Sequence, residues 1–185
     1  MPPTSDAEMT ATAEEPVLVE PFRHNRWANL KLLDACAQLE PARLFADAPG
    51  TFGSIYHTLM HIVRAEEWYN FLFTGQWLAG QMSSGAPPTP AELRARAARS
   101  GERLIELART AQPAQRVRWQ EDEGEVSLTS VELLTQAIQH ATEHRTHITT
   151  TLSRQGIEHP RINEWAYLCE RRGAAAPRAF HLFAQ

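Results

Sequence analysis

Residues 129–156 read TSVELLTQAIQHATEHRTHITTTLSRQG, and this stretch predicts one long helix that starts at a capping box and ends at a glycine. At about 100° of rotation per residue, His140, His144 and His147 fall on one face of that helix. Apolar residues precede them on the same face, so the three imidazoles should point into the protein. Because unpaired polar groups are costly in an interior, metal binding is one way to satisfy them.

The rest of the chain predicts further helices. Apolar periodicity and helix-capping residues place them at about 17–39, 54–73 and 89–110, with a short one near 163–171. The first helix is predicted to start at Val17 or at Pro21, and Pro21 is favoured because proline is tolerated at the start of a helix but not inside one. Apolar residues on both sides of Gly124 predict a short hairpin or an extended crossover before the long helix. Four long helices with little strand signal predict an all-α fold, namely a four-helix bundle with a long crossover connection and a short C-terminal helix.

Several local expectations accompany this fold. The helix at 89–110 is rich in arginine and has Gly101 in its middle, which should weaken it, so we expect a solvated outer helix. The Gly/Pro/Ser-rich loop at 75–88 is long enough to cover part of the protein. His24, near the start of the first helix, is expected at the surface.

Composition and pattern divide the chain into a flexible leader at 1–15, the bundle at 16–170 and a C-terminal tail at 171–185. The chain has 185 residues, is 43% hydrophobic and carries a net charge of −4, which supports a real core and disfavours nucleic-acid binding. It shows no apolar run of membrane-spanning length and no secretory signal. Its 2 cysteines do not make a disulfide framework, so we expect a cytoplasmic protein with no membrane partner.

The histidine spacing fits a transition-metal site. Such a site needs about three protein ligands and an open position for water or substrate, and two histidines one helical turn apart can bind one ion. His61 occupies a core position of the helix at 54–73 and is the natural third ligand after His140 and His144. Spacing alone leaves open whether His57 or His147 joins the site.

One competing motif lies in the same helix. The residues from His140 to His144 match the H-x-x-E-H pattern of inverzincin proteases, in which the glutamate, here Glu143, is the general base. Those proteases need another acidic ligand on a separate downstream helix, and the candidates here lie in a short tail: Glu158, Glu164 and Glu170. We therefore disfavour a protease.

Two segments together resemble a known family. TFGSIYHTLMHIVRAEEWY (51–69) and QHATEHRTHITTTLSRQGIEHP (139–160) are similar to the DinB/YfiT-like superfamily of metal-binding four-helix bundles. In that superfamily a helix-two histidine in S-I-x-x-T-L-x-H-I joins two helix-four histidines in H-x-x-x-H-R-G-Q. The similarity spans about residues 20–168 and implies three metal ligands: His61, His140 and His144.

The chain also departs from the family pattern. Arg145 matches the family's arginine, but Thr146 and His147 stand where glycine and glutamine are usual. His147 is therefore a candidate fourth ligand, ligand partner or proton carrier, and we count His147, Arg145 and Glu143 as candidate catalytic residues. His57 has no role in the family pattern and is interpreted as a residue of the pocket wall.

The resemblance implies several activities. Some members are S-transferases that use bacillithiol, mycothiol or glutathione, others are maleylpyruvate isomerases, and many are metal-dependent hydrolases. We predict an enzyme that uses a divalent transition metal, zinc or nickel, to add a low-molecular-weight thiol to an electrophile, because such a metal lowers the pKa of a bound thiol or water. The alternatives are a hydrolase or a non-catalytic metal-binding structural protein. We expect a homodimer. Core packing is the favoured role of three tryptophans, with a place in the apolar pocket as the alternative: Trp27, Trp68 and Trp77.

Overall fold

The computed structural model describes residues 15–78 and 87–173. Nearly all of the predicted leader at 1–15 and most of the predicted tail at 171–185 lie outside the described residues, as does the middle of the 75–88 loop.

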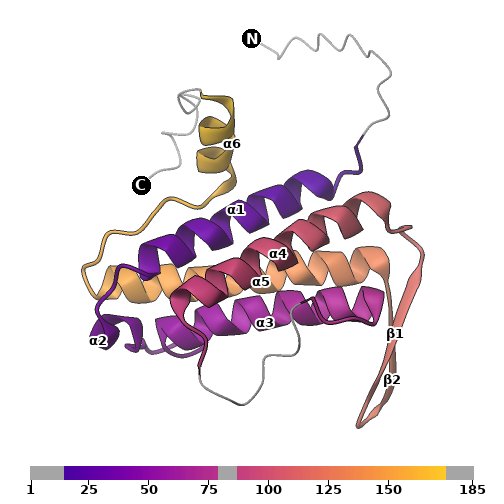
Figure 1. Ribbon diagram of the computed structural model, residues 1–185, viewed down its shortest axis with the longest axis horizontal. Coiled ribbons are helices and arrows are strands. Elements are labelled where there is room, and N and C mark those ends of the chain that lie inside the picture. Colours follow the sequence, from indigo (N-terminus) through magenta and orange to yellow (C-terminus); the bar gives the residue numbers. More distant parts are fainter. Residues whose placement is uncertain (1–14, 79–86, 174–185) are drawn as a thin grey trace.

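Four long helices form the body of the protein, so the prediction of an all-α bundle is confirmed (Figure 1). They are α1 (Val19–Cys36), α3 (Ile55–Thr74), α4 (Pro90–Thr110) and α5 (Ser130–Arg154). A single turn, α2 (Pro41–Leu44), follows α1, and the short α6 (Glu164–Arg172) supplies the expected C-terminal helix. The segment before α5 is an antiparallel hairpin of β1 (Arg116–Glu121) and β2 (Gly124–Thr129).

The helix ends follow local sequence signals. Thr89 and Thr129 each form a complete capping box at the start of α4 and α5, and the Ser54 side chain accepts a hydrogen bond from the His57 amide at the start of α3. Gly75 ends α3 in the left-handed region at φ 69°, where glycine is favoured. Pro21 lies in the first turn of α1, where the N–H that proline lacks would have no helical partner.

The direction of the helices identifies the long crossover. Helices α1 and α5 run one way and α3 and α4 run the other way (Figure 1). The hairpin therefore joins two antiparallel helices, whereas the connection from α3 to α4 has to return along the bundle. Helix α3 packs against α4 and α5, and α1 packs against the same two helices.

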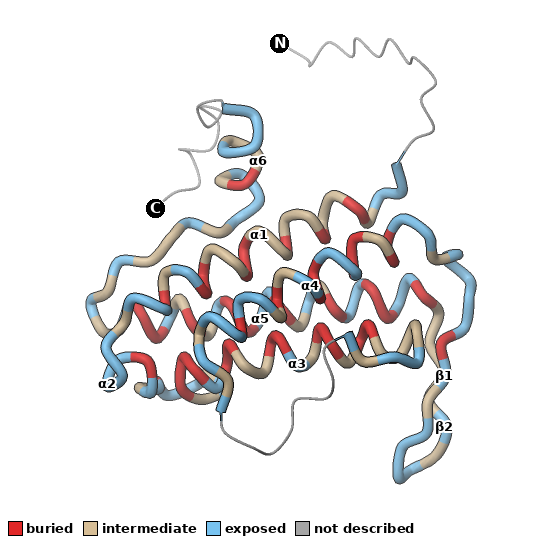
Figure 2. The backbone as a smooth tube through the Cα atoms, viewed as in Figure 1, coloured by how far each residue is buried: buried red, intermediate tan, exposed pale blue. Residues whose placement is uncertain are grey.

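The core consists of two apolar clusters with a polar layer between them. One cluster surrounds Leu33 and Leu59, and the other surrounds Phe22 and Leu104. Buried residues line the inward faces of the four long helices (Figure 2). Between the clusters, α1, α3 and α4 carry buried polar residues in place of apolar ones: Asn25, Asn29, Glu66 and Ser100.

Two expectations need correction. Helix α4 is not an outer helix, because its inner face is buried against α1 and α3. Close packing explains the glycine at position 101 of this helix, because a Cβ there would lie 2.8 Å from Cγ of Arg26. His24 is not a free surface residue either: its Nε2 lies 2.8 Å from the carbonyl oxygen of Ile162, and its Nδ1 lies 3.1 Å from Glu164.

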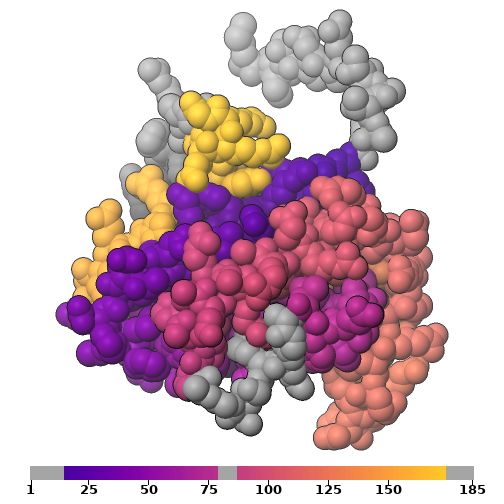
Figure 3. All heavy atoms as spheres, in the orientation of Figure 1, coloured from indigo at the N-terminus to yellow at the C-terminus, as the bar shows by residue number. Residues whose placement is uncertain are grey.

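These contacts explain how α6 is attached. Trp27 packs against Tyr167 and donates a hydrogen bond to Glu170, so α6 lies on α1, as the space-filling view shows (Figure 3). Within the described residues, none of the helices has the length and apolarity required to cross a membrane.

Candidate metal centre

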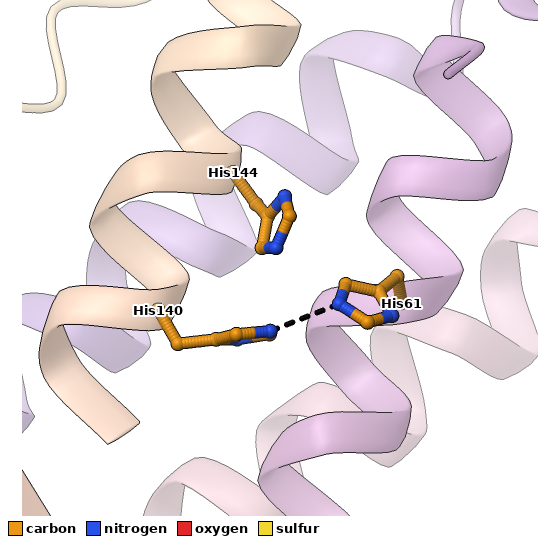
Figure 4. A group of neighbouring side chains, drawn as sticks. All are labelled: His61, His140 and His144. Atoms are coloured by element: carbon orange, nitrogen blue, oxygen red, sulfur yellow. Dashed lines mark hydrogen bonds between the residues drawn. The ribbon is translucent and has the colours of Figure 1, made fainter. Parts of the chain in front are cut away.

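Two antiparallel neighbouring helices bring three histidines together. His61 comes from the middle of α3, while His140 and His144 come from successive turns of α5 (Figure 4). One ring nitrogen of each lies within 4.8 Å of the other two. The three rings are 4.5, 4.6 and 4.8 Å apart between centroids. Spacing on one helix accounts for one pair, and only the packing of α3 on α5 adds the third residue.

The nitrogen separations suit a single small ion. His61 Nε2 lies 2.9 Å from His140 Nε2. Tetrahedral zinc with Zn–N distances of about 2.0–2.1 Å would hold its nitrogen ligands roughly 3.3 Å apart. The observed separations bracket this value, so small side-chain movements would complete the coordination geometry.

The three imidazoles are in the protonation state that metal binding requires. Burial, reinforced by the neighbouring histidines, lowers the pKa of His140 and of His144 to about 4. Burial and the charge of Arg64 also lower the pKa of His61. At neutral pH all three rings are therefore neutral, and a neutral imidazole nitrogen is the ligating form.

An unpaired ring nitrogen and the types of ligand present also suit a metal ion at this site. Nδ1 of His144 is buried and has no hydrogen-bond partner among the residues that the structure describes. The converging set contains neither a carboxylate nor a thiolate, and such all-imidazole sites suit zinc, copper, iron or nickel. Three protein ligands would also leave a coordination position open.

Aromatic side chains enclose the histidines. Phe52 stacks on His61 at a centroid distance of 4.2 Å and meets His144 edge-on at 4.8 Å. Its side chain is 50% exposed, so it forms a partial cover over the site. Tyr69 lies edge-on to His140 on another side. Sequence analysis missed Phe52, because a phenylalanine in a loop carries no periodic signal.

A cavity of about 370 Å³ adjoins two of the histidines, and its lining includes His61 and His140 together with Trp68 and Trp77. Trp68 and Trp77 therefore line a pocket, which was the alternative to the core role that the sequence favoured, whereas Trp27 belongs to the contact between α1 and α6.

The two additional candidate histidines lie outside the converging group. His147 is half-buried, and its ring centroid lies 5.3 Å from that of His144. Its Nδ1 is buried without a hydrogen-bond partner in the described part of the chain. His57 is exposed at the start of α3, where its Nδ1 lies 3.1 Å from the Ser54 hydroxyl.

The other two candidate catalytic residues are not part of the cavity lining. Glu143 is exposed on α5. Arg145 is buried in the bundle interior, where it donates hydrogen bonds to Asn25 and Asn29. Burial lowers its pKa to about 10, and the negative charge of Glu66 opposes this effect. The structure therefore gives Arg145 a place in the core, not a contact with a substrate.

Glu66 is the partner that sequence analysis missed. Its Oε1 accepts hydrogen bonds of 2.7 Å from Asn25 and from Asn29, and its Oε2 accepts one of 2.8 Å from Ser100. Burial raises its pKa to about 7, although the hydrogen bonds from Ser100 and Asn25 and the charge of Arg145 oppose the rise. The sequence signal that could have indicated a buried polar partner is the pair Asn25 and Asn29, which lie one turn apart on the apolar side of α1.

The protease pattern finds no support in this arrangement. Glu164 binds His24, and Glu170 pairs with Lys31 and accepts from Trp27, so both are held against α1. Glu158 is exposed. No carboxylate belongs to the group of residues that converges on the histidine site within the described ranges.

The sequence profile of the DinB family matches residues 9–173, which is most of the chain. A search of curated proteins finds no match.

Proposed function

The chain belongs to the DinB family, and from this membership and the three-histidine site we propose that it is a metal-dependent enzyme that transfers a low-molecular-weight thiol to an electrophile. The proposed metal ligands are His61, His140 and His144. The observation that carries the proposal is the convergence of three neutral imidazole nitrogens beside a cavity large enough for a small molecule.

The chemistry follows from the ligand set. A divalent transition metal such as zinc or nickel, when bound there, would lower the pKa of a thiol at its open position and so produce a nucleophile at neutral pH. Phe52 and Tyr69 limit the access of water to the histidines. The cavity beside His61 and His140 would hold the reacting partner.

The remaining candidate residues have supporting roles in this proposal. Arg145 follows His144 directly and anchors its turn of α5 to the core through Asn25 and Asn29. His147 borders His144 and restricts the position of its ring. Glu143 is exposed and is not part of the cavity lining, so we assign it no contact with substrate. The homodimer and the cytoplasmic location stay predictions.

The first experiment tests the ligands. The purified chain is loaded with zinc or nickel, dialysed, and analysed for metal by elemental analysis. The parent protein should retain a metal ion per chain, whereas His61→Ala and His140→Ala should lose it. His57→Ala, an exposed histidine of the same helix, is the matched control and should retain the metal. Undiminished metal in both ligand variants would refute the ligand assignment.

The second experiment tests the reaction. Metal-loaded protein is assayed for consumption of glutathione, bacillithiol or mycothiol in the presence of an alkylating electrophile. We expect His144→Ala to lower the rate at least 100-fold, roughly the loss of a group that polarises the reacting atom. If His144→Ala keeps its fold and the parent's rate, the enzyme proposal fails. If the metal binds but the parent never exceeds the uncatalysed rate, the non-catalytic structural alternative is favoured.

A further inference from the structure

The cavity beside the histidines carries an unbalanced positive charge. Arg64 lies three residues after His61 on α3, and its side chain is part of the cavity lining. It is exposed, and the structure shows no ion pair for it with any described residue. Glu67, the acidic residue of the lining, is buried and pairs with Arg96 at 2.7 Å. Among the described residues, the lining therefore presents a cation without a matching anion.

Arg64 and the proposed ligand His61 belong to the same helix and to the lining of the same cavity. Residues three apart on a helix are neighbours, with Cβ atoms about 5–6 Å apart. An anion held by Arg64 would consequently lie beside His61.

The other walls of the cavity are aromatic and held in place by further rings. Trp77 stacks on Phe71 at 4.7 Å with 15° between the planes. Trp68 meets Trp119 of the hairpin edge-on at 5.6 Å. Tyr69 completes the aromatic lining. Rings that are already packed need little rearrangement to receive a flat apolar group.

We propose that this cavity binds a small carboxylate with a planar apolar body, and that Arg64 is the residue that selects it. The carboxylate pairs with the guanidinium of Arg64, and the planar part lies between Trp68 and Trp77. A guanidinium can bind a carboxylate through two parallel hydrogen bonds, and a volume of about 370 Å³ accommodates one or two rings. This inference rests on the proposed function for its role, because the bound carboxylate is a substrate of the histidine site.

Calorimetric binding of two matched probes tests the inference. 2-Naphthoate has the charge and the planar body, and 2-naphthamide has the same shape without the charge. We expect the parent protein to bind naphthoate about tenfold more tightly, which is the size of a charge-assisted hydrogen bond. Arg64→Gln should abolish this preference and leave the binding of naphthamide unchanged.

The matched control is Arg154→Gln. Arg154 is also an exposed arginine, at the end of α5, and lies 14 residues from His140, or about 20 Å along the helix. It should retain the full preference for naphthoate. Equal binding of the two probes by the parent, absence of binding by either, or an undiminished preference in Arg64→Gln would overturn the inference.

Two further arms identify the reactant that carries the carboxylate. If it is the electrophile, naphthoate and the neutral thiol 2-mercaptoethanol will bind the zinc-loaded protein together. If it is the thiol, 3-mercaptopropionate will compete with naphthoate and depend on Arg64. Either result supports the carboxylate site. Probe binding to chelated protein is measured in parallel, so a failed carboxylate site and a failed metal site give different results.

Discussion

The carboxylate of Glu66 and the guanidinium of Arg145 are linked through two shared asparagines. Asn25 and Asn29 each donate their amide N–H to Glu66 and accept a hydrogen bond from Arg145 at the amide oxygen. Ser100 adds a contact from α4, so all four long helices meet in one buried network. Removal of one member leaves the polar groups of its partners in a dry interior without a hydrogen bond. Such a substitution should therefore lower the free energy of unfolding.

The first prediction concerns this linkage. Above the pKa of Glu66, which is about 7, Arg145→Met should lower the free energy of unfolding by about 3–5 kcal/mol, because it leaves the ionised carboxylate of Glu66 buried without a counter-charge. The same substitution should cost clearly less in a Glu66→Gln background, where that charge is absent. Urea unfolding of the four proteins measures the difference. Arg103→Met, at an exposed position of α4, is the control and should change stability by less than about 0.5 kcal/mol. Equal costs in the two backgrounds would contradict the linkage.

The second prediction concerns acid stability without metal. The folded-state pKa of His140 and of His144, about 4, lies below the ordinary 6.5, so the unfolded chain takes up protons first as the pH falls. Their contribution to stability is therefore complete above about pH 6.5 and is lost as the pH falls toward 4. In chelated protein, the parent should lose more stability from pH 7 to pH 5 than His140→Leu.

The comparison with His140→Leu is needed because the titration of Glu66 changes the free energy of unfolding with pH in the opposite direction. Its folded-state pKa, about 7, lies above the ordinary 4.5, so its contribution is complete below pH 4.5 and is lost as the pH rises to 7. This contribution is common to parent and variant and cancels in their difference. Identical pH profiles for the two proteins would contradict the lowered pKa of His140.

The third prediction concerns Gly101. Alanine is favoured over glycine in a helix by about 1 kcal/mol, yet Gly101→Ala should destabilise the protein by roughly 1–2 kcal/mol. The reason is that the new Cβ would lie 2.8 Å from Cγ and 3.0 Å from Cβ of Arg26. Arg26→Ala removes the longer part of this side chain, so the penalty of Gly101→Ala should shrink in that background. Thermal unfolding of the four proteins tests it, and a stabilising Gly101→Ala in the parent would contradict the close packing of α1 on α4.

The fourth prediction concerns the aromatic cover. Phe52→Ala should raise the pKa of His61 toward 6.5, because burial is the largest cause of its lowered pKa and Phe52 stacks on its ring. NMR titration of histidine ring protons in chelated protein measures this. Phe45→Ala is the matched control, since Phe45 is similarly exposed but packs against Tyr56 and His57. The interpretation of Phe52 as a cover would be wrong if both variants left the pKa of His61 unchanged.

Much of the fold was predictable because its signals are local. The capping boxes at Thr89 and Thr129 and the glycine after α3 set helix ends through contacts within a few residues. Apolar periodicity identified the four long helices. The start of α1 lies at Val19, two residues before the favoured Pro21, because the N-cap residue Leu18 makes no side-chain cap that would mark this end in the sequence.

The candidate site likewise combines local features with features that depend on tertiary packing. The sequence by itself determined that His140 and His144 share one face of a helix, because that relation depends only on helical geometry. It also predicted His61 as the third ligand from its core position on another helix, and the family resemblance implies the same residue. Only the tertiary structure decided that three nitrogens converge, that Phe52 covers them and that Arg64 faces a cavity beside them. It also turned Arg145 inward, to a network with Glu66. Such relations depend on which faces of distant helices meet, and that is settled by the packing of the whole core, not by any single stretch of sequence.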